Sequence, residues 1–182
     1  MIPRLLLFIL LSLAACSADR LYSTPDEVPQ ARVAVAWDSV EVVEVTLPTY
    51  AASEAIYVRE ADGAIAALGP LWSDDPARAT TLQLSRDLAA ITGARVAPDP
   101  WPFRGFAEVR LDVRIEDFVA TGPGTFLISG QYFVAPDSGR GDRARRFRIE
   151  VPLTAGTAAG IAAARGSAVA QLAEQIAREG LR

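Results

Sequence analysis

The chain has 182 residues, enough for one domain with a hydrophobic core, and carries a formal net charge of −4. It has no histidine, a single cysteine, and no lysine among its 18 basic residues. These absences exclude serine–histidine, cysteine–histidine and lysine-based catalytic groups, and they leave only carboxylates as ligands for a zinc or iron site. The acidity disfavours general nucleic-acid binding. We therefore expect no enzyme, no cofactor and no metal centre.

An apolar stretch near the N-terminus ends at the only cysteine. Residues 5–15 are apolar apart from Ser12, and they follow a single positive residue, Arg4. The stretch is too short to cross a membrane as a helix, which needs about 20 residues, but it suits a secretory signal. Its last residues, Leu-Ala-Ala-Cys, form the lipobox pattern of bacterial lipoproteins. We predict that residues 1–15 are a signal peptide and that Cys16 is lipidated; the alternative is a leftover cysteine in an ordinary export signal.

The residue after Cys16 bears on where the protein resides. In Gram-negative bacteria, aspartate at this position tends to retain a lipoprotein at the inner membrane, whereas serine usually permits transfer to the outer membrane. Ser17 therefore predicts attachment to the periplasmic face of the outer membrane. Residues 16–30 are polar with two prolines and are predicted to be the lipidated N-terminus and a tether. Residues 31–182 are predicted to form one domain.

The first half of that domain is predicted to contain three strands, a helix, and then a short strand within residues 94–103 that leads into a proline-rich loop. A valine-rich segment over 31–48 predicts one or two strands. A further strand is expected near 55–59, followed by a tight turn at residues 62–63 into another strand. Pro76 suits the first position of a helix, and Gly93 suits its C-terminal cap.

The second half is predicted to be an antiparallel meander followed by a helix. Apolar and polar residues alternate over 107–118, 125–136 and 145–153, and the connections between these strands are short. Residues 157–180 are rich in alanine and predict the second helix. The expected fold class is therefore mixed α/β, with a mixed sheet of about six or seven strands packed by two long helices.

Two groups of residues are candidates for contact with a partner. Trp72, Trp101 and Phe103 lie in proline-bearing loops, where they form either an interface or caps on the core. A cluster of arginines suits an acidic partner or lipid headgroups, unless it is simply a solvated face. The cluster consists of Arg140, Arg143, Arg145, Arg146 and Arg148, and we select Arg143, Arg145 and Arg146 as possible interface residues.

Two acidic features have simpler explanations than chemistry. Asp74 and Asp75 directly precede Pro76 and are expected to cap the helix rather than to form a catalytic pair. Residues 137–142 contain two aspartates but lack the ligand spacing of a calcium loop, so a hairpin turn is expected.

Four short motifs, together with the lipobox, carry a family resemblance. They are Leu47-Pro48-x-Tyr50, Trp72-x-Asp74-Asp75-Pro76, Val96-Ala97-x-Asp99-Pro100-Trp101-Pro102 and Ser129-Gly130-Gln131-Tyr132-Phe133. With these motifs the chain resembles the PqiC family of ABC-type transport auxiliary lipoproteins, over essentially the whole mature sequence.

The resemblance implies a fold similar to anticodon-binding-like sandwiches and an accessory role in a transport system of the MCE (mammalian cell entry) type. It further implies an MCE-domain partner, assembly of several copies into a ring, and lipid transport across the periplasm. It supplies no catalytic residues. Two alternatives remain: a stand-alone periplasmic module that binds a lipid or small molecule, and a carboxylate-dependent hydrolase.

Overall fold

The described residues form one mixed sheet of eight strands and two long helices. The computed structural model describes residues 20–25, 28–122, 124–139 and 141–182. The strands are β1 (Leu21–Tyr22), β2 (Ser39–Val42), β3 (Ala55–Arg59), β4 (Ile65–Trp72), β5 (Arg95–Pro98), β6 (Val109–Thr121), β7 (Thr125–Pro136) and β8 (Arg143–Pro152). The helices are α2 (Pro76–Thr92) and α3 (Ala158–Gln175), with short turns η2 (Thr49–Ala51) and η3 (Ile176–Gly180).

The long strand β6 organises the sheet. On one side it pairs antiparallel with β7, which pairs antiparallel with β8, so the predicted meander is confirmed. On its other side β6 pairs in parallel with β2 near its start and with β3 near its end. The sheet therefore branches: β2 leads to β5, and β3 leads to β4 and β1. A strand of 13 residues spans about 40 Å, so the two branches lie at opposite ends of the domain.

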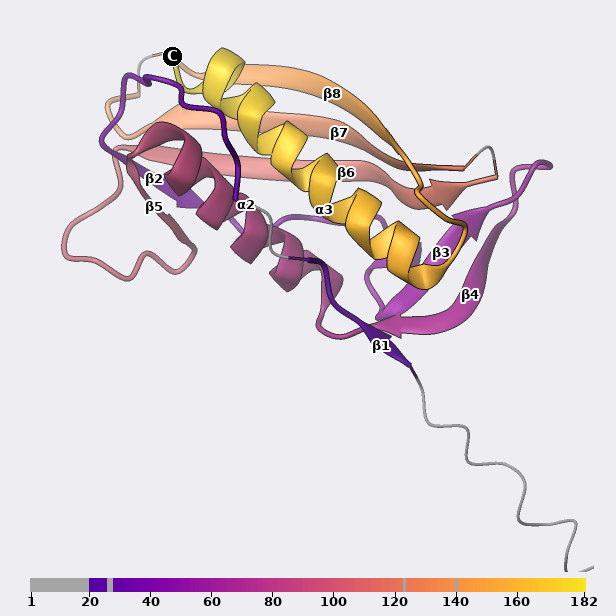
Figure 1. Cartoon of the computed structure of the whole chain (residues 1–182). Helices are drawn as coiled ribbons and strands as arrows, with labels where there is room; N and C mark the ends of the chain where they lie inside the picture. Colours follow the sequence, from indigo (N-terminus) through magenta and orange to yellow (C-terminus); the bar gives the residue numbers. More distant parts are fainter. Residues whose placement is uncertain (1–19, 26–27, 123, 140) are drawn as a thin grey trace, which may run out of the picture.

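Both helices cover the same face of the sheet (Figure 1). Alternate residues of β6, β7 and β8 point into this layer, where they pack against the apolar sides of α2 and α3. The main contributors are Leu111, Val113, Phe126, Ile128, Phe147, Leu84, Leu88, Val169 and Leu172. The other face of the meander carries charged side chains, and neither of the described helices covers it (Figure 1).

Helix α2 begins and ends where the sequence predicts. The Asp75 side chain accepts a hydrogen bond from the Arg78 backbone N–H at 2.8 Å, and Pro76 occupies the first turn. Gly93 caps the C-terminus with a left-handed φ of 72°. Asp74 forms an ion pair with Arg78. Both aspartates therefore serve the helix start, as expected.

The fold class is confirmed, but one strand lies in the segment predicted to be a tether. Leu21 and Tyr22 pair in parallel with Leu71 and Trp72, and this short β1 brings the sheet to eight strands instead of six or seven. Two residues carry too little periodicity to predict a strand from sequence. The domain boundaries themselves stay a prediction.

The chain after β1 crosses the helical layer (Figure 1). The methyl group of Thr24 would lie 2.5 Å from a Cβ at Gly166, so a larger residue there would force the Thr24 side chain or α3 to move. Residues 31–37, predicted as strand, are not strand: the Val33 N–H donates to the Ile91 carbonyl and the Ala36 N–H to that of Leu181, each at 2.9 Å. Within the described ranges, no helix is long and apolar enough to span a membrane.

Candidate docking surfaces

The loop between β5 and β6, residues 99–108, presents three aromatic side chains; we call it the aromatic loop. Trp101 and Phe103 contact each other edge to face, with ring centroids 5.0 Å apart. The Arg95 guanidinium lies 5.3 Å from the Phe103 ring centroid. Phe103 is 45% exposed and Phe106 is 89% exposed. The loop therefore carries apolar surface that the domain itself leaves uncovered.

Hydrogen bonds fasten both ends of the aromatic loop to β2. The Trp101 backbone N–H donates to Glu41 Oε1 at 3.1 Å. At the other end the Glu108 N–H donates to Ser39 Oγ at 3.0 Å, and Glu108 Oε2 accepts from the Asp38 N–H at 2.9 Å. The exposed rings thus stand on a base fixed at two points.

A surface hollow of about 370 Å³ adjoins the aromatic loop. It is lined by Glu41, Trp101, Phe106, Ala107, Arg110, Ala135, Pro136 and Asp137. Arg110 and Glu41, which both line the hollow, form an ion pair at 3.2 Å, so their charges neutralise each other. A hollow with apolar walls and a charged margin suits an apolar side chain of a partner.

Sequence reasoning selected Trp101 and Phe103 but missed Phe106, which is the most exposed of the three. The signal was present, because Phe106 lies in the same proline-bearing segment three residues after Phe103. Its exposure depends on the loop projecting away from the sheet, which the segment alone does not show.

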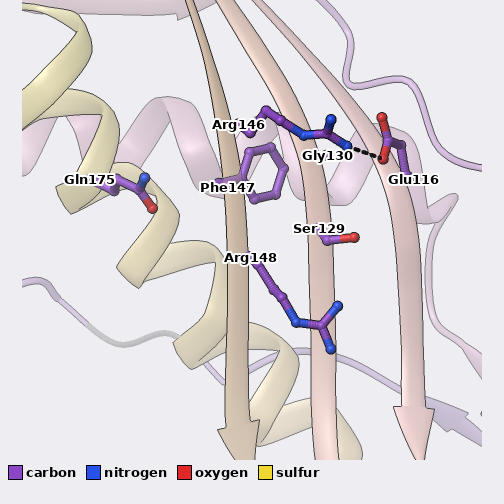
Figure 2. Close-up of a pocket in the computed structure, with 7 residues that line it drawn as sticks. All are labelled: Glu116, Ser129, Gly130, Arg146, Phe147, Arg148 and Gln175. Atoms are coloured by element: carbon purple, nitrogen blue, oxygen red, sulfur yellow. Dashed lines mark ion pairs between the residues drawn. The ribbon is translucent and has the colours of Figure 1, made fainter.

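The open face of the meander is covered by ion pairs. Arg114 pairs with Asp112 at 2.7 Å, and Arg148 pairs with Glu150 at 2.5 Å. Figure 2 shows Arg146 paired with Glu116, at 3.6 Å. Because these carboxylates face the arginines, the open face is closer to neutral than the arginine cluster in the sequence indicates.

The residues drawn in Figure 2 line a hollow of about 410 Å³ beside the middle of β8. They are Glu116, Ser129, Gly130, Arg146, Phe147, Arg148 and Gln175, from β6, β7, β8 and α3. Gly130 has no side chain to fill the space between its neighbours. Polar and charged groups dominate the lining, so the hollow does not resemble an apolar ligand pocket.

The other selected arginines lie at the start of β8. Arg143 donates to the Gly180 carbonyl at 2.8 Å and so fastens the end of the C-terminal helix. Arg145 is exposed and donates to the neighbouring Ala144 carbonyl at 3.0 Å. No carboxylate of the described residues forms an ion pair with Arg145, whereas Arg146 pairs with Glu116 and Arg143 is engaged with Gly180.

Beneath these arginines, the hydroxyl of Tyr132 is buried and has no hydrogen-bond partner among the described residues. Burial raises the pKa of Tyr132 to about 12, with a further increase from Glu179 and opposing effects of Arg145 and Arg143. The folded state therefore favours the neutral phenol. This stabilisation is complete below pH 10, the ordinary tyrosine pKa, and is lost as the pH rises through 12.

We expect an ultraviolet titration to show one of the four tyrosines ionising near pH 12. Tyr132→Phe should remove this last step and leave the fold intact, because the hydroxyl gives up no hydrogen bond. A titration in which Tyr132→Phe changes only the steps near pH 10 would contradict this assignment.

The expectation that Trp72 forms part of an interface is wrong. Trp72 ends β4 and is only 3% exposed. Its ring lies against the buried guanidinium of Arg165, 4.6 Å from the ring centroid. The residue therefore belongs to the core, where α3 covers it.

Two of the selected residues, Cys16 and Ser17, lie outside the described residues, as does Arg140. Within the part that is described, no group of three or more cysteine or acidic side chains is placed to hold a metal ion. Asp137 lies in the turn between β7 and β8, as expected for a hairpin.

These features define a two-layer α/β domain. Within the described ranges, its aromatic loop carries exposed apolar side chains. The chain belongs to the family of ABC-type transport auxiliary lipoprotein components, whose sequence profile matches residues 21–177. The resemblance drawn from the four motifs is thereby confirmed. None of the curated proteins compared with the chain matches it.

Two solved structures have the same fold. One, the crystal structure of an uncharacterized protein, aligns with a TM-score of 0.73 at 19% identity and covers 89% of this chain and 98% of its own. The other, protein XCC0632 from Xanthomonas campestris, aligns with a TM-score of 0.70 at 17% identity and covers 86% of this chain and 91% of its own. At these identities the comparison establishes the fold alone.

Proposed function

We propose that the protein is a lipoprotein anchored through Cys16 to the inner leaflet of the outer membrane. In this proposal its domain is the accessory, docking component of an MCE-type intermembrane lipid transport system and contributes to envelope integrity. Membership of the transport auxiliary family supports the transport role. The lipobox and Ser17 support the anchor and the destination.

The exposed aromatic loop is the observation on which the docking role rests. The loop adjoins the start of β6, whereas β1, the part of the described chain nearest to Cys16, lies in the branch at the other end of β6. An anchored domain can therefore present Phe103 and Phe106 at a distance from the membrane. Aromatic residues that enter a partner's pocket commonly dominate the binding energy.

We expect Phe106→Ser to weaken binding to the MCE-domain protein of the same transport system by about 30-fold, since an aromatic anchor contributes about 2 kcal/mol. Phe103→Ser should act in the same direction, and neither loss should depend on salt. Arg145→Glu should weaken binding mainly at low salt, as expected of a charge at the rim. Size-exclusion chromatography with light scattering, with and without the partner, measures the effect.

Val28→Ser is the matched control, because Val28 is also an exposed apolar residue, at 69%, but it lies against α2, in a hollow that it shares with Gln83 and Ala90. Circular dichroism should show that every variant is folded. Self-assembly of the wild type would appear in the same light-scattering run, and it would extend the proposal to a ring of copies. A wild type that stays monomeric and ignores the partner would exclude docking and favour a stand-alone lipid- or small-molecule-binding module.

A further inference from the structure

Strand β4 has an unusual composition for an exposed strand. Its eight residues, IAALGPLW, include no charged and no hydrogen-bonding side chain before the final tryptophan. Ala66, Ala67, Leu68 and Gly69 are exposed, Leu68 to 40%. Solvent-facing strand positions usually carry polar residues, so this surface is suited to an apolar environment.

The outer edge of β4 is also left unpaired. β1 pairs only with Leu71 and Trp72, and no described strand pairs with residues 65–70 on that side. Natural proteins cover or charge such edges. On β1, next to this edge, Leu21 is 59% exposed. Leu21 and residues 66–69 together form what we call the apolar corner.

Two sets of interactions hold the apolar corner in place. Arg59 at the end of β3 forms an ion pair with Asp117 of β6, and Ser129 Oγ donates to the same carboxylate at 2.7 Å. The Leu71 N–H donates to the Arg20 carbonyl at 3.0 Å, which fastens the start of the described chain to β4. The chain therefore enters the domain at a fixed point beside the corner (Figure 1).

The length of chain before that point decides what can cover the corner. Only three residues separate Arg20 from Cys16. A fully extended chain advances at most about 3.6 Å per residue, so Arg20 lies within about 14 Å of Cys16. Because Arg20 directly precedes Leu21, acyl chains on Cys16 would hold the Leu21 end of the corner close to the bilayer surface.

We infer that the apolar corner rests on the surface of the phospholipid bilayer that holds the lipid anchor, and so orients the domain with its aromatic loop pointing away from the membrane. This inference rests on the proposed anchoring at Cys16. The hairpin between β3 and β4 carries Glu60 and Asp62 in its turn, so the contact is apolar and not an attraction to anionic lipids. Its strength should therefore be insensitive to salt.

A single introduced thiol can test the contact, because the only native cysteine is expected to be acylated. The full-length chain carrying Leu68→Cys is labelled with the fluorophore nitrobenzoxadiazole and reconstituted in vesicles of phosphatidylethanolamine and phosphatidylglycerol. We expect the label to be quenched by aqueous iodide about threefold less than the same label in Ala135→Cys, which lies on β7 next to the aromatic loop. Ala66→Cys is a second probe of the corner in case Leu68→Cys folds poorly.

The possible outcomes distinguish failure of the membrane contact at the apolar corner from failure of the lipid anchor at Cys16. Equal quenching at Leu68→Cys and Ala135→Cys, in chains that float with the vesicles, overturns the inference and leaves the anchor intact. Protection of Leu68→Cys in a lipid-free chain that also carries Cys16→Ser shows that a second copy covers the corner, which also overturns it. Chains that fail to float refute the anchor, and the inference with it. Protection that appears only on vesicles and persists at high salt supports the inference.

Discussion

Replacing Trp72 with alanine is expected to destabilise the domain by about 3–5 kcal/mol, the usual cost of removing a large aromatic ring from a core. Trp72 is 3% exposed at the end of β4, so its removal leaves a cavity under α3. The ring also supports the buried Arg165, whose guanidinium lies 4.6 Å from the Trp72 centroid and 5.4 Å from that of Phe118.

The loss should be large because Arg165 has few other partners. It donates to Thr80 Oγ1 at 3.2 Å and to the Pro76 carbonyl at 3.4 Å, while its Nε has no partner among the described residues. Burial lowers the pKa of Arg165 to about 10, against the opposing effect of Asp74 and Asp75, so the group stays charged at neutral pH. Removing the ring takes away a cation–π contact from a desolvated cation.

Urea denaturation followed by circular dichroism, on the chain from Ser17, measures this change. Phe106→Ala is the matched control: Phe106 is 89% exposed, so its removal should change stability by no more than about 0.5 kcal/mol. If Trp72→Ala lowers the free energy of unfolding by no more than Phe106→Ala does, Trp72 is not a core residue. It would then again be a candidate interface residue.

Replacing Gly130 with alanine is expected to cost about 3 kcal/mol, at the upper end of the cost of overpacking a core. A Cβ on Gly130 would lie 2.1 Å from the Arg114 carbonyl oxygen, far inside contact distance. That oxygen belongs to the backbone of β6, so no side-chain rotation can relieve the clash. The neighbouring strands would have to separate at the centre of the meander.

The close approach at Gly130 results from a β-bulge in β6. Ile115 pairs with Gly130 and Asp117 pairs with Ser129, so Glu116 is the extra residue of the bulge. The bulge shifts the alternation of β6: Ile115 faces the core before it, and Phe118 does so after it. Without the bulge, the second half of β6 would turn its apolar face to solvent.

Gly156→Ala is the matched control for Gly130→Ala, since a Cβ at Gly156 would meet no atom within 4 Å. Both variants lose the same backbone freedom in the unfolded state, so their difference reports what opposes a side chain at Gly130 in the folded state, namely the clash and the φ of 159°. Thermal unfolding of the two variants and the wild type measures that difference. Similar midpoints for both variants would show that the bulge relaxes without cost.

Local signals were enough to predict most of the elements. Pro76 and Gly93 marked the ends of α2 because both act within one helical turn. The alternation of Val109, Leu111 and Val113 predicted their common burial in β6. The bulge is also visible in the sequence, since the spacing of apolar residues changes from two to three between Ile115 and Phe118.

The buried polar residues of α2 could not be predicted in the same way. Thr80, Thr81 and Ser85 are buried, and each hydroxyl donates to a carbonyl one turn earlier in the helix. Thr81 Oγ1 also accepts from the Val45 N–H at 2.8 Å. These residues are tolerated because the helix satisfies them itself, and they are buried because the sheet, α3 and the N-terminal segment enclose α2 on several sides.

The sequence by itself determined the α/β class, the meander, the ends of α2, the family, and the prediction of a lipid anchor at Cys16, because these depend on residues close together in the chain. Only the tertiary structure decided that Trp72 is buried, that Arg146 and Arg148 are paired with carboxylates, and that Phe106 is exposed. Burial and ion pairing depend on which distant segments come to lie beside a residue. Which segments become neighbours is determined only when the two branches of the sheet and both helices pack around β6.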